Sequence, residues 1–148
     1  MMTRGKSLIL AGLLLLPASQ SMAQDGTGGD ATAGEQVYKK CMTCHRIGPD
    51  AKNLIGPEHN GLIGRPAGTA PGFAYSPLNK AAGAAGLTWT EANVFAYLED
   101  PNAFLKKFLT DKGKADEAVG VTKMTFKLPS EKERKDVIAY IKTFQNAK

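Results

Sequence analysis

Five consecutive residues carry the most specific chemistry in the sequence: Cys41-Met42-Thr43-Cys44-His45, a CxxCH pattern. The pattern is typical of covalent haem attachment. Two thiols three residues apart can reach the two vinyl groups on adjacent pyrrole edges, and the histidine that follows can then bind the iron. We therefore predict one haem c, held through two thioethers by Cys41 and Cys44, with His45 as an axial ligand of the iron.

Three other uses of these residues compete with haem attachment. A thioredoxin-like CxxC motif needs a βαβ context, which the sequence does not show. A zinc site needs a fourth ligand, which His59 could supply, but adjacent CxxC and histidine ligands crowd a tetrahedron. A plain disulfide between the two cysteines would leave the glycine-rich segment 48–87 without a core.

A second axial ligand is predicted by elimination among the five methionines. Met1, Met2 and Met22 lie in the leader described below, and Met42 lies inside the attachment motif, on the same side of the haem as His45. Only Met124 remains, in a loop from which it can approach the opposite face. A lone methionine is otherwise most often a core residue that fills gaps, and His59 is the other free candidate.

The first 23 residues resemble a secretory signal peptide. Two basic residues precede the apolar run 8–16, and the small residues at 21–23 are typical of a cleavage site. Nine apolar residues are too few to span a membrane, which takes about 20. Cleavage would leave a single domain, 24–148, with 17 basic and 14 acidic residues in the periplasm.

Three amphipathic stretches of the mature chain predict an all-α fold. Helices are expected over about 30–42, 90–99, with a short restart from Pro101, and from Ser130 onward. Gly34 costs stability within the first of these helices and implies a close contact with another helix. The long segment 48–87 has no regular pattern, so we expect it to wrap a large apolar object.

The sequence resembles a known family, the class I soluble cytochromes c. The resemblance is strongest to the bacterial cytochrome c-two subgroup and its mitochondrial relatives. The matching motifs follow one another in order along the mature chain: CMTCH at 41–45, GP at 56–57, GLIGRPAG at 61–68, APGFAYSPLN at 70–79, LTW at 87–89, YLEDP at 97–101, TKMTF at 122–126 and DVIAYIK at 136–142. The resemblance implies the cytochrome c fold, with three main helices, short helices and long loops wrapped around one haem.

The resemblance also implies roles for individual residues. His45 and Met124 would be the axial ligands, and Pro57 would fix the His45 ring through its backbone carbonyl. Tyr75 and Trp89 would hydrogen-bond the buried haem propionate, with Arg65 nearby. Three more would form a polar network beside the Met124 sulfur: Asn79, Tyr97 and Thr122. Phe126 would cover the haem edge. The alternative for Trp89 and Tyr97 is that they are aromatic residues of the core with no role toward the haem.

Two places depart from the mitochondrial pattern. His59 stands where an apolar residue is usual beside the haem. The stretch from Pro101 to Met124 is longer than in the mitochondrial proteins.

The function that these features predict is electron transfer by a periplasmic carrier that is not an enzyme. Its iron would cycle between ferric and ferrous states, with donors and acceptors such as a membrane cytochrome complex, a terminal oxidase, a reaction centre or a periplasmic dehydrogenase. Two alternatives stay open: a five-coordinate haem enzyme or sensor that binds small ligands, and a thiol–disulfide module. We expect a monomer with no nucleic-acid partner and no stable membrane insertion.

Charge is unevenly distributed along the mature chain. Residues 106–148 carry 11 basic and 6 acidic side chains, whereas 24–105 carry 6 basic and 8 acidic ones. Six lysines are expected to ring the haem edge: Lys40, Lys106, Lys107, Lys114, Lys123 and Lys127. Acidic faces of redox partners would be steered to such a ring.

Overall fold

The computed structural model describes residues 28–147, so the predicted signal peptide lies outside the described residues. Its elements are α1 (Ala31–Tyr38), α2 (Pro77–Ala84), α3 (Glu91–Glu99), α4 (Pro101–Asp111), the short 3-10 helix η1 (Ala115–Glu117) and α5 (Glu131–Lys142). An isolated bridge between Pro66 and Thr88 is the only β pairing in this part of the chain. The predicted all-α class is confirmed.

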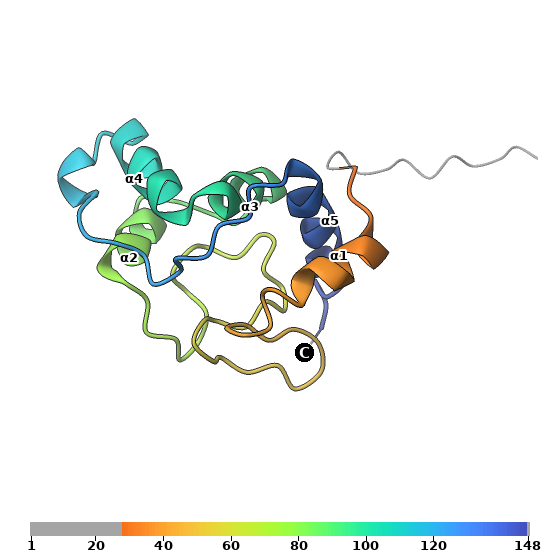
Figure 1. Ribbon diagram of the computed structural model, residues 1–148. Helices are drawn as coiled ribbons and strands as arrows, with labels where there is room; N and C mark the ends of the chain where they lie inside the picture. Colours follow the sequence, from red (N-terminus) through yellow and green to blue (C-terminus); the bar gives the residue numbers. More distant parts are fainter. Residues whose placement is uncertain (1–27, 148) are drawn as a thin grey trace, which may run out of the picture.

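The helices gather on one side of the molecule, and long loops form the other side (Figure 1). Helix α4 lies between α2 and α3 along one edge, and α5 crosses α1 at the other. The segment from the end of α1 to the start of α2 sweeps below them as a long loop. The connection from α4 to α5 runs back across the front.

Each of the five α-helices begins at a side chain that accepts a hydrogen bond from its first turn. Asp30 accepts from the backbone of Thr32 and Ala33, 2.8 and 3.2 Å away, at the start of α1. The other caps are Ser76, Thr90, Asp100 and Ser130. Pro77 and Pro101 occupy the first position of their helices, where proline has no hydrogen bond to lose.

Two helices were not fully anticipated by the sequence. Helix α2 lies in the segment 48–87, which was expected to be irregular. The sequence does not predict this helix because eight residues are too few to show a clear apolar period. Helix α4 continues to Asp111, three residues beyond the apolar positions that predicted a short restart. Part of the segment that is long relative to the mitochondrial pattern is therefore helix. The first helix, in contrast, ends at Tyr38, and the residues up to Cys44 form turns.

The crossing of α1 and α5 explains Gly34. A Cβ atom on this glycine would lie 2.0 Å from the carbonyl oxygen of Asp136, so only glycine lets the two backbones approach this closely. Tyr38 packs on Tyr140 at the same crossing, with ring centroids 5.3 Å apart. The Asp136 carboxylate also accepts from the backbone N–H of Asp30, at 2.9 Å. The predicted compensation for glycine in a helix is thus found.

Replacing Gly34 by alanine should lower the free energy of unfolding by about 1–3 kcal/mol, because the added methyl group has no room against α5. Denaturant unfolding of the full-length protein measures this. The control is Glu35→Ala, on the exposed side of the same helix, which should change the free energy by less than about 0.5 kcal/mol. Equal stability of both variants would contradict the close crossing.

Candidate functional site

The CxxCH residues lie in tight turns directly after α1. The backbone N–H groups of Cys44 and His45 both donate to the Cys41 carbonyl, at 3.0 and 2.9 Å, which holds the two thiols and the imidazole on one compact turn. Both cysteines are half-buried and not joined in a disulfide. Burial raises the pKa of the Cys41 thiol to about 11, with a smaller opposing effect from Lys40.

His45 is buried and its ring is fixed by the backbone that follows the motif. Its Nδ1 lies 2.7 Å from the Pro57 carbonyl oxygen, so Nδ1 carries the proton and donates, and Nε2 keeps its lone pair for a ligand bond. A Cβ on Gly56 would lie 2.3 Å from the His45 ring, so glycine is required beside it. Burial lowers the pKa of His45, which favours the neutral form that binds metals.

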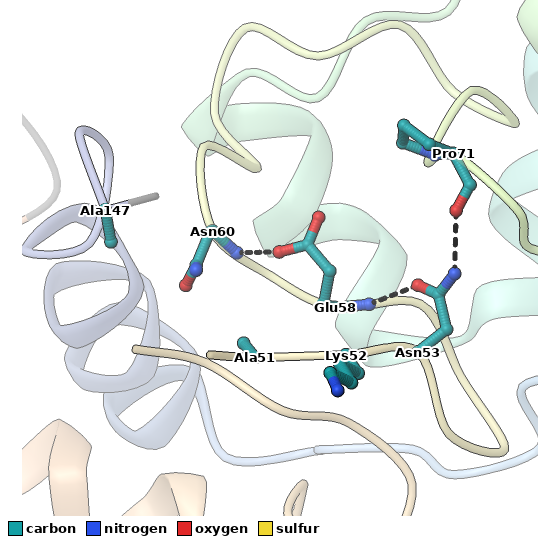
Figure 2. A pocket seen from close by; sticks show the side chains of 7 residues that line it. All are labelled: Ala51, Lys52, Asn53, Glu58, Asn60, Pro71 and Ala147. Atoms are coloured by element: carbon teal, nitrogen blue, oxygen red, sulfur yellow. Dashed lines mark hydrogen bonds between the residues drawn. The ribbon is translucent and has the colours of Figure 1, made fainter. Parts of the chain in front are cut away.

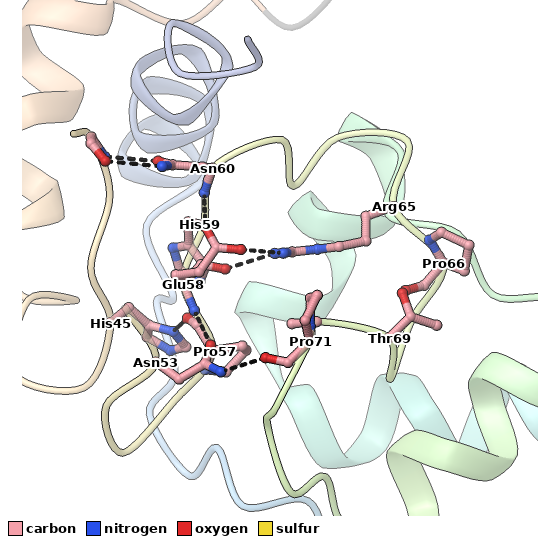
Figure 3. A network of polar contacts seen from close by, with 12 residues as sticks. His45, Asn53, Pro57, Glu58, His59, Asn60, Arg65, Pro66, Thr69 and Pro71 are labelled. Atoms are coloured by element: carbon pink, nitrogen blue, oxygen red, sulfur yellow. Dashed lines mark hydrogen bonds and ion pairs between the residues drawn. The ribbon is translucent and has the colours of Figure 1, made fainter. Parts of the chain in front are cut away.

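A braced loop carries Pro57 to this position (Figure 3). The Asn53 side chain accepts from the Glu58 backbone at 3.0 Å and donates to the Pro71 carbonyl at 2.8 Å. Asn60 exchanges two hydrogen bonds with the Gly48 backbone, at 2.8 and 2.9 Å. These amides tie both flanks of Pro57 to neighbouring loops.

The same amides line a surface hollow (Figure 2), together with Ala51, Lys52, Glu58, Pro71 and Ala147. None of the residues predicted for the haem site lines it. We interpret the hollow as the outer side of the loop that holds Pro57.

Arg65 makes a contact that the sequence did not predict. Its guanidinium donates to a Glu58 carboxylate oxygen and to the Glu58 carbonyl, both at 2.7 Å. The side chains are only 13% and 20% exposed, so this ion pair is partly shielded from water. Arg65 was expected near a haem propionate, and Glu58 is the anion that the structure places beside it.

Tyr75 and Trp89 lie on different neighbours. The Tyr75 hydroxyl accepts from the Ala70 backbone at 3.3 Å, and its ring packs edge-on against Phe73. Trp89 is buried and packs on Tyr97, with ring centroids 4.8 Å apart. Whether these two groups meet a common propionate stays a prediction.

The polar network predicted beside Met124 forms from three separate elements. The buried Thr122 hydroxyl donates to Asn79 Oδ1 at 3.0 Å. The Tyr97 hydroxyl lies 3.5 Å from the same Thr122 hydroxyl. The Met124 backbone N–H donates to the same hydroxyl oxygen, at 3.3 Å. Ser76, the cap of α2, donates to Asn79 at 2.8 Å and completes the network. Thr122 thereby joins the loop of Met124 to α2 and α3.

The remaining predicted residues lie at the surface. Phe126 is 40% exposed. Four of the six lysines are paired with acidic side chains: Lys40 with Glu133, Lys107 with Asp111, Lys114 with Glu117 and Lys127 with Asp100. Lys123 donates to the Ala74 carbonyl instead. The pairing of these lysines, which the sequence did not show, offsets part of the positive charge of the predicted ring.

His59, whose partner the sequence left open, lies against the motif. Its ring stacks on His45 with centroids 4.1 Å apart and planes 24° apart. Its Nδ1 lies 3.0 Å from the hydroxyl of Tyr38. Burial lowers the pKa of His59 well below its ordinary value. No three acidic, cysteine or histidine side chains of residues 28–147 cluster as metal ligands, so the alternative zinc site is not assembled.

Comparison with known proteins identifies the family. The family model described as cytochrome c matches residues 31–145. The chain belongs to the cytochrome c family. Cytochrome c2 iso-1 of Rhodospirillum centenum is 67% identical over 118 residues, which are 80% of this chain and 98% of that protein. A cytochrome c2 of Rhodopseudomonas palustris is 59% identical over 135 residues, 90% of this chain and 95% of its own length.

The solved structures agree with the predicted fold. The structure of cytochrome c2 from Rhodospirillum centenum superposes with a TM-score of 0.78 at 66% identity, covering 78% of this chain and 98% of the other. This cytochrome c therefore binds covalently attached haem c and acts as an electron carrier. No helix within residues 28–147 is long and apolar enough to cross a bilayer.

The residues present fit a haem. Neutral imidazole and thioether are ligands that haem iron takes in electron carriers, and the free His45 Nε2 and the half-buried Met124 offer one of each. The thiols of Cys41 and Cys44 are unpaired and within one turn of His45.

Replacing Thr122 by valine should lower the free energy of unfolding by about 1–3 kcal/mol, because the isosteric change leaves the Met124 N–H without its partner and removes one of the two hydrogen bonds that Asn79 Oδ1 accepts. Denaturant unfolding of the haem-bound protein measures the loss. Thr143→Val is the matched control, since Thr143 is exposed and its hydroxyl bonds only the Tyr140 carbonyl nearby. A loss at Thr143 as large as that at Thr122 would refute the role of the network.

Proposed function

We propose that this protein is a periplasmic one-electron carrier whose haem is attached through Cys41 and Cys44 and ligated by His45 and Met124. The observation that carries the proposal is the hydrogen bond from His45 Nδ1 to the Pro57 carbonyl, 2.7 Å long, within a CxxCH turn. That bond selects the tautomer whose free nitrogen can bind iron. The haem would supply the one-electron couple between ferric and ferrous iron.

The protein's own part is to hold two ligands still. Pro57 holds His45, and the Thr122 hydroxyl holds the backbone of Met124. Two permanent ligands leave no open position for a substrate, which favours a carrier over an enzyme or a ligand sensor. A thioether ligand in a buried site also favours the ferrous state and raises the reduction potential.

The thiol–disulfide alternative has less support from the structure. Catalytic thiols act as thiolates and have lowered pKa values. Cys41 shows the opposite, because its burial raises the pKa to about 11. A neutral, half-buried thiol suits attachment to an apolar cofactor.

Replacing Met124 by leucine should abolish the iron–sulfur charge-transfer band of the ferric protein and lower its reduction potential, because the apolar volume is kept while the ligand sulfur is lost. Visible spectroscopy and a redox titration measure both. Met42→Leu is the matched control, since Met42 is 49% exposed inside the attachment motif. The assignment of Met124 fails if its variant keeps the band or if the Met42 variant loses it.

The proposed docking face consists of the six lysines named above, none of which is buried. Acidic faces on redox partners would be attracted to it, giving fast, salt-sensitive encounters of low affinity. The ion pairs to Asp100, Asp111, Glu117 and Glu133 are at the surface, where such pairs contribute little and can yield to a partner's carboxylates.

Oxidation of the ferrous protein by the anion hexacyanoferrate(III) should slow as ionic strength rises, because salt screens the attraction to the lysines. Stopped-flow mixing measures the rate. Lys106→Glu should lower the rate at low salt more than Lys80→Glu, a matched charge change on α2. Neither lysine forms an ion pair with another described residue. A rate that is independent of salt would remove the docking proposal.

A further inference from the structure

The His59 ring and the Tyr38 hydroxyl form a contact pair behind the proposed axial ligand. Tyr38 is 2% exposed, at the end of α1, and its hydroxyl lies 3.0 Å from His59 Nδ1. The His59 ring lies 4.1 Å from the His45 ring and nearly parallel to it. A chain of contacts thus runs from α1 through two side chains to His45.

The bond to Pro57 limits the rotation of the His45 ring about its Cβ–Cγ bond only loosely. A hydrogen bond tolerates a range of angles, so the plane of the ring can still tilt while Nδ1 keeps its partner. A flat ring stacked on one face opposes that tilt. His59 supplies such a ring, and Gly56 lets the backbone approach His45 closely enough to limit the remaining space.

The hydrogen bond to Tyr38 gives the stacked ring a fixed place of its own. Burial raises the pKa of the Tyr38 hydroxyl far above its ordinary value, so this hydroxyl stays protonated and donates. His59 Nδ1 is then the acceptor, and its second nitrogen carries the proton. The Tyr38 ring is itself held at the crossing of α1 and α5 by Tyr140.

We propose that His59, anchored by the Tyr38 hydroxyl, is a positioning residue that sets the plane of the His45 imidazole. This inference rests on the proposed ligand role of His45. An apolar side chain in place of His59 could fill the same volume, but it would present no flat face and would accept no hydrogen bond from Tyr38. The orientation of the axial ring would then be less restrained.

The test compares ferric haem-bound variants by proton NMR, because the spread and order of the paramagnetically shifted haem methyl signals report the plane of an axial imidazole. His59→Leu should change this pattern, and Tyr38→Phe should change it in the same sense by a smaller amount. Tyr140→Phe is the control, since its ring contacts are with Tyr38 and Phe144, and it should leave the pattern unchanged.

Each outcome decides something. An unaltered pattern in His59→Leu overturns the proposal, and an altered one with Tyr38→Phe identical to wild type overturns the anchoring by Tyr38. Loss of thermal stability without a change in the pattern would assign His59 a purely structural role. If His59→Leu does not fold, Tyr38→Phe carries the test alone: a shifted pattern supports the anchored His59 ring, and a wild-type pattern overturns the proposal. A wild-type protein without the iron–sulfur band would instead refute the proposed function.

Discussion

The proposed iron ligand, His45, is held by a backbone carbonyl twelve residues further along the chain. The Pro57 carbonyl accepts the Nδ1 proton at 2.7 Å and leaves Nε2 free. The rest of the site can be understood as what keeps that carbonyl in place. Asn53 and Asn60 tie its loop to neighbouring segments, and the Glu58–Arg65 pair anchors the following residue.

The crossing of the terminal helices serves the same end from the other side. Gly34 allows α1 and α5 to approach closely, and the tyrosine at the end of α1 reaches His59 from there. The attachment motif begins three residues after that tyrosine. The packing of α1 on α5 therefore helps to position the start of the motif.

Much of this arrangement could be predicted from the sequence, because its signals are local. The CxxCH spacing, the cap at Ser130 and the amphipathic stripe of α5 each depend on residues a few positions apart. The polar network of Asn79, Tyr97 and Thr122 was predicted only from the resemblance to the family, because these three residues are far apart in the sequence.

Other contacts could not be predicted because they depend on tertiary placement. Nothing in the spacing of Tyr38 and His59 shows that their polar atoms meet, or that Glu58 takes the guanidinium of Arg65. Glu133 shows the same limit. Ser130 accepts from its backbone as the capping pattern predicts, but its carboxylate pairs with Lys40 of the α1 region.

His45 and Met124 are proposed to occupy both axial positions of the haem. Mixing the purified ferrous protein with carbon monoxide tests this most directly, because this gas binds ferrous haem wherever a position is open. The visible spectrum should stay unchanged over the time of mixing, because both positions are occupied. Rapid formation of a carbon monoxide adduct by the folded wild-type protein would contradict it.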